Sequence, residues 1–147
     1  GHKSLNARSI GIELVNPGHD FGYRPFPALQ MMALETLALD ILARHSIPPR
    51  NVVGHSDIAP TRKNDPGELF DWRSLAAKGI GMWPERAANG PSNVMDALET
   101  VGYETLDYAR ALAAFQRHFR PVEIQGVSDS DTLCWLQGTV ELVEKMG

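Results

Sequence analysis

Alternating apolar and polar positions open the chain and predict a strand over Ser9–Val15. Ile10, Ile12 and Leu14 fall on one face of this strand, and a period of two is typical of a half-buried strand. The turn-forming run Asn16-Pro17-Gly18 follows at once and ends the pattern. The chain therefore begins with a predicted strand rather than a helix.

A spacing of three and four residues then predicts an amphipathic helix over Ala28–His45, which the two prolines at 48 and 49 end. Residues 51–55 form a second predicted strand, with His55 as its last residue. A strand, a helix and a second strand are typical of a crossover that places two parallel strands in one sheet. The sequence thus predicts the α/β class, with a partial mixed sheet and flanking helices over residues 1–85.

The remaining part of the chain has a different pattern and predicts a second domain. Residues 86–91, which hold alanine, asparagine, glycine and proline, predict a linker. Helical patterns follow, and they predict a small three-helix domain over residues 92–147. The expected helices cover about 92–101, 106–119 and 130–146. Arg117 and His118 on the second of them, and Arg120 directly after it, are expected to be no more than a solvated face.

Composition narrows the classes of function. The chain has 147 residues, of which 43% are hydrophobic, and this content suits a packed core. A net charge of −4 gives no electrostatic reason to bind nucleic acid, which is not an expected partner. The single cysteine, Cys134, excludes an internal disulfide and has apolar neighbours that predict a buried thiol. No apolar run reaches the roughly 18–20 residues that cross a bilayer, so no transmembrane segment is expected in this chain.

The densest polar chemistry lies in residues 54–67, directly after the second predicted strand. His55 ends that strand, and the loop brings Lys63 and Asp65 back close behind it. A neutral imidazole and a carboxylate are suitable zinc ligands, and a fixed lysine can stabilise a developing oxyanion. Spacing alone does not distinguish such a site from ordinary residues of a surface loop.

The fuller pattern resembles the zinc-dependent N-acetylmuramoyl-L-alanine amidases, which are related to phage lysozyme-type amidases and peptidoglycan recognition proteins. The resemblance rests on Ser9–Leu14, on Asn51–Pro60 with Arg62–Gly67, and on Gly79–Pro84, and it covers roughly residues 1–84 in order. It implies that His55 and Asp65 bind Zn²⁺, that Lys63 assists the transition state, and that the amide between N-acetylmuramic acid and L-alanine is hydrolysed. His19 and Tyr23, in the loop after the first predicted strand, are candidate substrate-binding residues, with simple loop packing as the alternative.

The chain departs from the family pattern at its amino-terminal end. The family's first zinc histidine and its catalytic glutamate precede the Ser9–Leu14 strand, but only eight residues of this chain do so. We therefore expect an amino-terminally truncated domain whose third ligand and general base lie outside the chain. His2 is the available substitute for that ligand, but it is out of register. Asp57 is expected to be a turn residue or a hydrogen-bond acceptor rather than a ligand.

The carboxy-terminal part resembles the three-helix peptidoglycan-binding domain. The resemblance rests on Phe115–Pro121 and on Gly126–Thr132, which has the Gly-x-x-Asp-x-x-Thr type of turn. The alternative is a plain helical bundle with core aromatic residues. With this domain attached, peptidoglycan or muropeptides are the expected substrate, and the bacterial cell envelope (periplasm or outer membrane) is favoured over the cytoplasm. The competing hypothesis is a non-catalytic peptidoglycan-binding or recognition protein.

Overall fold

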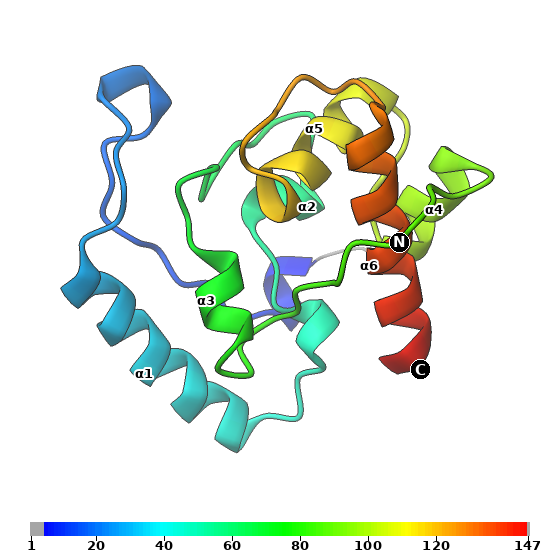
Figure 1. Cartoon of the computed structure of the whole chain (residues 1–147). Coiled ribbons are helices and arrows are strands. Elements are labelled where there is room, and N and C mark those ends of the chain that lie inside the picture. Colours follow the sequence, from blue (N-terminus) through cyan, green and yellow to red (C-terminus); the bar gives the residue numbers. More distant parts are fainter. Residues whose placement is uncertain (1–4, 147) are drawn as a thin grey trace.

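A computed structural model describes residues 5–146, over which the chain forms helices joined by extended segments and turns (Figure 1). Three of the segments are short 3-10 helices and six are α-helices. They are η1 (Leu5–Arg8), η2 (His19–Phe21), α1 (Ala28–Arg44), η3 (Pro49–Asn51), α2 (His55–Ile58), α3 (Trp72–Ala76), α4 (Val94–Val101), α5 (Tyr108–Phe119) and α6 (Ser130–Met146). In Figure 1, α1 lies at one side of the molecule and α4, α5 and α6 at the other, with α2 and α3 between them.

The predicted α/β class is wrong, because residues 5–146 contain no strand. The first predicted strand has no regular secondary structure. The second overlaps η3 only at Asn51 and α2 only at His55, and residues 52–54 between them are in neither helix nor strand. A strand needs a neighbour to accept its backbone hydrogen bonds, and the described part of the chain offers none. Leu14 still packs on a hydrophobic cluster, whereas Ile10 and Ile12 are 52% and 40% exposed.

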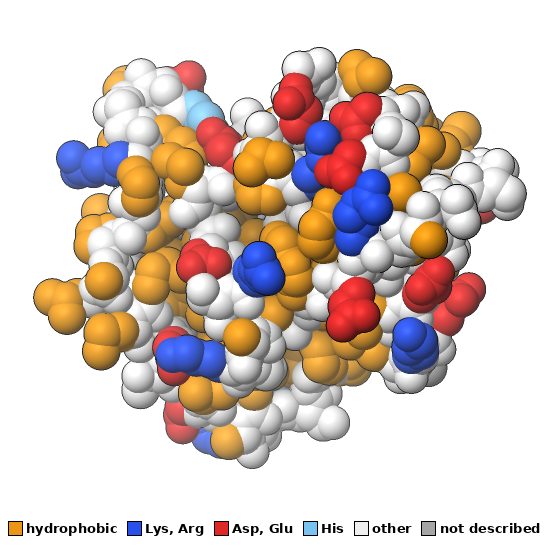
Figure 2. All heavy atoms as spheres, viewed as in Figure 1, with side chains coloured by type: hydrophobic (Ala, Val, Ile, Leu, Met, Phe, Trp, Pro, Cys, Tyr) orange, Lys and Arg blue, Asp and Glu red, His pale blue; other side chains and the backbone are white. Residues whose placement is uncertain are grey.

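The long predicted helix is confirmed as α1, which ends one residue before its expected end. Its buried residues are Leu34 and Ala38, which pack towards α3 as part of an amino-terminal cluster. Leu29 and Met32 on the same helix are 80% and 61% exposed. Figure 2 shows hydrophobic side chains gathered on the side of the molecule that carries α1. Among the described residues, no helix has the length and apolar character needed to cross a membrane.

The helices α4, α5 and α6 pack around a second cluster, in which Leu98, Leu112, Phe115 and Leu136 have no exposed surface. Asn93 caps the start of α4 and Asp107 caps the start of α5, because their side chains accept hydrogen bonds from otherwise unpaired backbone N–H groups. Trp83 packs on both this cluster and the amino-terminal one. The two clusters are therefore in contact through a shared side chain.

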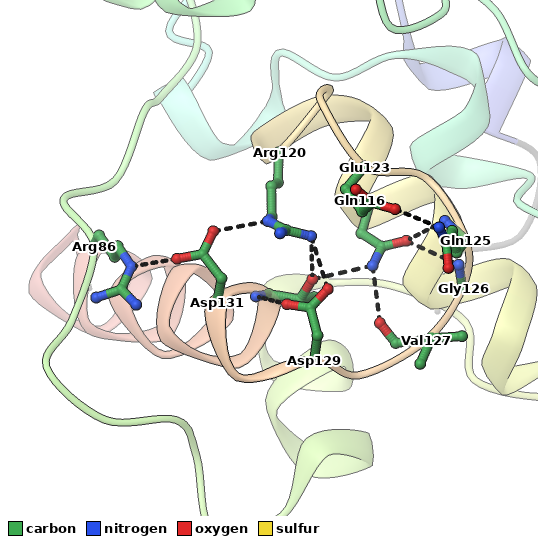
Figure 3. A network of polar contacts seen from close by, with 10 residues as sticks. Arg86, Gln116, Arg120, Glu123, Gln125, Gly126, Val127, Asp129 and Asp131 are labelled. Carbon is green, nitrogen blue, oxygen red and sulfur yellow. Dashed lines mark hydrogen bonds and ion pairs between the residues drawn. The ribbon is translucent and has the colours of Figure 1, made fainter.

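Gln116 holds the loop between α5 and α6 from the inside (Figure 3). Its buried amide nitrogen donates to the Val127 carbonyl and the Thr132 hydroxyl, each at 3.0 Å. Its amide oxygen accepts from the N–H groups of Gln125 and Gly126, at 3.1 and 2.9 Å. Every polar atom of the buried amide is thus paired, as burial requires. The loop with the Gly-x-x-Asp-x-x-Thr pattern is shaped by these bonds.

Ion pairs continue this network towards the segment before α4 (Figure 3). Arg120 contacts Asp129 at 2.9 Å and Asp131 at 2.8 Å, and Asp131 also pairs with Arg86 at 2.6 Å. Hydrogen bonds from Arg86 and then Arg120 lower the pKa of the Asp131 carboxyl. Arg120 therefore belongs to a paired network rather than to the solvated face expected from the sequence.

Candidate active site

His55 and Asp65 are brought together at the start of α2, as the loop between them predicts. The distance from His55 Nδ1 to Asp65 Oδ2 is 3.1 Å, and the two side chains are 43% and 60% exposed. The backbone N–H of Ser56 donates to the Asp65 carbonyl at 2.9 Å and fixes the loop against the helix. The pair is open to solvent and reachable by a ligand.

This pair has the chemistry of two zinc ligands. Two donors that bind one tetrahedral zinc ion at about 2.0–2.1 Å lie roughly 3.3 Å from each other, close to the observed separation. Catalytic zinc sites use three protein ligands. Over residues 5–146, no group of three His, Cys, Asp or Glu side chains is placed to hold a metal ion. The pair fits part of a zinc site and does not complete one, and His2 lies outside the described residues.

Lys63 lies between the two candidate ligands in the sequence, in the turn that follows α2. Its backbone N–H donates to the Ala59 carbonyl at 3.0 Å, and its side chain is half-buried. None of the ion pairs formed within residues 5–146 involves Lys63. Its ammonium group therefore remains available to a ligand, and its catalytic role stays a prediction.

His19 and Tyr23 lie against the loop that carries Asp65. The Tyr23 hydroxyl donates to the Pro66 carbonyl at 2.8 Å and accepts from the Leu69 N–H at 3.0 Å. The His19 ring stacks on Tyr23 with centroids 4.2 Å apart, and its Nε2 lies 3.0 Å from a Glu68 carboxylate oxygen. Both candidate residues thus contact residues 66–69, which directly follow Asp65, while their contact with substrate stays a prediction.

The environments of Tyr23 and Glu68 shift the pKa of each group. Burial is the main cause that raises the pKa of Tyr23, and the Glu68 carboxylate adds to it. For Glu68, burial acts to raise the pKa, but the hydrogen bond from His19 and smaller effects outweigh it and lower the pKa. Tyr23 is therefore a neutral hydroxyl and Glu68 an anion, so Tyr23 is suited to hydrogen bonding and not to proton abstraction.

Gly67→Ala is expected to displace Tyr23 from this loop. A Cβ at residue 67 would lie 2.3 Å from the Tyr23 hydroxyl oxygen, and the backbone φ there is +89°. Gly18→Ala is the matched control, because its φ is +74° but a Cβ would meet no atom within 4 Å. Left-handed backbone costs an L-residue about 1–2 kcal/mol at either site, and the clash adds roughly 1 kcal/mol more at residue 67. Urea unfolding of the two variants measures the difference, and equal losses would contradict it.

Behind the site, Asp57 forms a buried network that the sequence does not reveal. Its carboxylate accepts from the Tyr103 hydroxyl at 2.8 Å and from His118 Nδ1 at 2.7 Å. Asp57 was expected to act as an acceptor, and this is confirmed, whereas His118 is 4% exposed and not part of a solvated face. Burial and the nearby Asp57 raise the pKa of Tyr103 well above its usual value, so its hydroxyl stays a donor. The one signal in the sequence is spacing, because His118 follows Phe115 by three residues and Ala111 by seven, and this places it on the buried face of α5.

Comparison with known proteins gives this site a context. Residues 1–68 match the family described as N-acetylmuramoyl-L-alanine amidase. The N-acetylmuramoyl-L-alanine amidase AmiD of Escherichia coli is 40% identical over 171 aligned positions, which cover 100% of this chain and 61% of AmiD. The 1,6-anhydro-N-acetylmuramyl-L-alanine amidase AmpD of Enterobacter cloacae is 42% identical over 77 positions, which cover 52% of this chain and 39% of AmpD.

Solved structures agree with these relatives. The complex of E. coli AmiD with the substrate anhydro-N-acetylmuramic acid-L-Ala-D-gamma-Glu-L-Lys has a TM-score of 0.72 and 39% identity, covering 82% of this chain and 55% of AmiD. AmpDh3 from Pseudomonas aeruginosa in complex with anhydromuramic pentapeptide also has a TM-score of 0.72, at 34% identity, covering 83% of this chain and 56% of AmpDh3. The chain thus spans between 39% and 61% of the length of these relatives.

Proposed function

We propose that this chain, whose residues 1–68 match the N-acetylmuramoyl-L-alanine amidase family, is part of an enzyme that hydrolyses the amide between N-acetylmuramic acid and L-alanine. The observation that carries the proposal is the His55–Asp65 pair at 3.1 Å, on the segment that the family match covers. Both AmiD and AmpD are N-acetylmuramoyl-L-alanine amidases by name, and the match to AmiD extends over the whole chain.

Zinc is the proposed cofactor, with His55 and Asp65 as two of its ligands. The donor types and their separation support this assignment, and no third His, Cys, Asp or Glu side chain of residues 5–146 is placed with them to hold a metal ion. A bound zinc ion supplies an acidified water and a polarised amide carbonyl. Lys63, half-buried and without an ion pair in the described part of the chain, is proposed to stabilise the negative charge that develops on that carbonyl oxygen.

The proposed substrates are muropeptides or peptidoglycan, and the proposed location is the bacterial cell envelope. The structures of AmiD and AmpDh3 are complexes with anhydromuramoyl peptides, which makes these the first substrates to test. The loop of His19 and Tyr23, which is fixed beside Asp65, is proposed to contact the substrate. Residues 92–147 are proposed to bind peptidoglycan, on the strength of the Gln116 loop and its Gly-x-x-Asp-x-x-Thr pattern.

A second candidate function is binding of peptidoglycan without hydrolysis. The observation that favours it is the incomplete ligand set, because residues 5–146 bring two ligands together where catalytic zinc sites use three. Both functions involve binding of the same peptidoglycan or muropeptide, and they differ in whether the amide is cut.

The test is to incubate the full chain with anhydro-N-acetylmuramoyl-L-Ala-D-γ-Glu-L-Lys, with and without added Zn²⁺, and to follow release of the free peptide by chromatography. The amidase proposal expects zinc-dependent release that a chelator stops. Binding of the muropeptide by calorimetry with no release at any zinc concentration would contradict the amidase proposal and support the binding protein.

A further inference from the structure

We propose that Tyr103 and His118, both from the carboxy-terminal helical part, are positioning residues for the His55–Asp65 pair. They act through Asp57, the buried carboxylate two residues after His55. The proposal rests on the proposed function for the roles of His55 and Asp65. It gives the carboxy-terminal helices a share in shaping the active site, in addition to any part in binding the polymer.

The Asp57 carboxylate is the centre of the arrangement. It is 7% exposed and accepts hydrogen bonds from the Tyr103 hydroxyl at 2.8 Å, from His118 Nδ1 at 2.7 Å and from the Gly54 N–H at 2.7 Å. A carboxylate without such donors is costly to bury. Two of its three donors come from residues that lie 46 and 61 positions further along the chain.

Asp57 determines where His55 lies because α2 is a single turn. His55 is the first residue of this helix and Asp57 the third, and the bond from the Gly54 N–H to Asp57 closes the start of the helix. Space around this start is small, since a Cβ at residue 54 would lie 2.8 Å from the Pro66 ring and 3.3 Å from the Asp57 carboxylate. A shift of Asp57 therefore moves His55 relative to the loop of Asp65.

The two donors are themselves rigidly held. The His118 ring lies between Trp72 and Phe119, with centroids 4.1 and 4.0 Å away and planes within 14° of parallel. The His118 ring bonds to Asp57 through Nδ1. Its other ring nitrogen, Nε2, is buried and has no hydrogen-bond partner among the described residues, so Asp57 is the partner of this side chain there. Tyr103 is 6% exposed and packs edge-on against Phe115. Asp57 thus receives its bonds from side chains with little freedom to follow it.

Two substitutions of His118 separate hydrogen bonding from packing. His118→Phe keeps a ring between Trp72 and Phe119 but removes the donor to Asp57. His118→Asn loses the stacked ring but keeps an N–H donor at the position of Nδ1. Tyr103→Phe removes the hydroxyl alone. Its combination with His118→Phe leaves the Gly54 N–H as the remaining hydrogen-bond donor to Asp57.

The measurement is the imidazole ¹⁵N spectrum of His55 in the full chain at one fixed pH, together with its Zn²⁺ affinity by calorimetry. Loss of groups that orient metal ligands typically weakens binding about 10–100-fold. We therefore expect changed His55 signals and at least about tenfold weaker zinc binding in His118→Phe and in the double variant, and near wild-type values in His118→Asn. Val143→Ala, at a buried position on α6, is the control for loss of stability alone.

The opposite pattern would overturn the proposal. If His118→Asn disturbs the His55 signals and His118→Phe does not, His118 acts through packing, and the same holds if Val143→Ala matches the double variant. The spectrum of His55 does not depend on turnover, so it decides the proposal even if the wild-type chain fails to cut the muropeptide. That failure would count against the proposed function only.

Discussion

His55→Ala is expected to abolish zinc-dependent amide hydrolysis and to lower zinc affinity by more than about 100-fold. Loss of a residue that only orients a metal ligand weakens metal binding about 10–100-fold, and this sets the lower limit of the expected effect. His55 is itself a proposed ligand, and the structure describes one other, Asp65, within reach. Its side chain is 43% exposed, so the variant is expected to fold normally. Peptide release and zinc calorimetry on the same protein measure both effects.

His45→Ala is the matched control, because this histidine is also exposed but lies at the end of α1. Its activity and zinc affinity are expected to equal those of the wild type. Lys63→Ala adds a second distinction, since it is expected to keep zinc binding while lowering kcat about 10²–10³-fold, as loss of an oxyanion donor does. Retained hydrolysis in His55→Ala would remove His55 from the proposed ligands.

The longer helices α1 and α5 are well predicted by the sequence, because a helix satisfies its own backbone hydrogen bonds. A period near 3.6 residues defines α1 and α5, and the observed bounds agree with the expected ones to within two residues. Each such helix needs only an apolar face to pack, which Leu34 provides on α1 and Phe115 on α5.

The predicted strands are wrong because a strand, unlike a helix, cannot satisfy its own backbone hydrogen bonds. Alternation over Ser9–Val15 shows that one side of the segment is apolar, but pairing depends on a neighbouring strand elsewhere in the chain. Residues 5–146 supply no such neighbour, and the segment has no regular secondary structure and leaves Ile10 and Ile12 exposed. A local pattern cannot report a distant partner.

The candidate site shows the same division between local and distant information. His55, Lys63 and Asp65 lie within eleven consecutive residues, and their proximity follows from one loop. The contacts of Asp57 with Tyr103 and His118 join positions far apart in sequence, and a histidine on an amphipathic helix is ordinarily assigned to solvent. Without the tertiary structure, nothing pairs these three residues.

Gly138→Ala is expected to destabilise the protein by about 3–5 kcal/mol, although alanine favours a helix over glycine by about 1 kcal/mol. A Cβ at this position of α6 would lie 1.8 Å from the Glu85 carbonyl oxygen and 3.3 Å from the Ala87 nitrogen. Both atoms belong to backbone, which no side-chain rotation can move away. The clash therefore outweighs the gain in helix propensity.

Relief of this clash has to break the contacts that hold residues 85–90 on α6. These are the bond from the Ala87 N–H to the Cys134 carbonyl at 3.1 Å and the Arg86–Asp131 ion pair at 2.6 Å. Trp83, two residues before Glu85, packs on both hydrophobic clusters, so the loss is expected to lower the stability of the whole chain in one transition. Gly11→Ala is the matched control, because a Cβ there meets no atom within 4 Å. Urea unfolding followed by tryptophan fluorescence measures both variants, and equal stability of the two would show that the segment before α4 moves freely over α6.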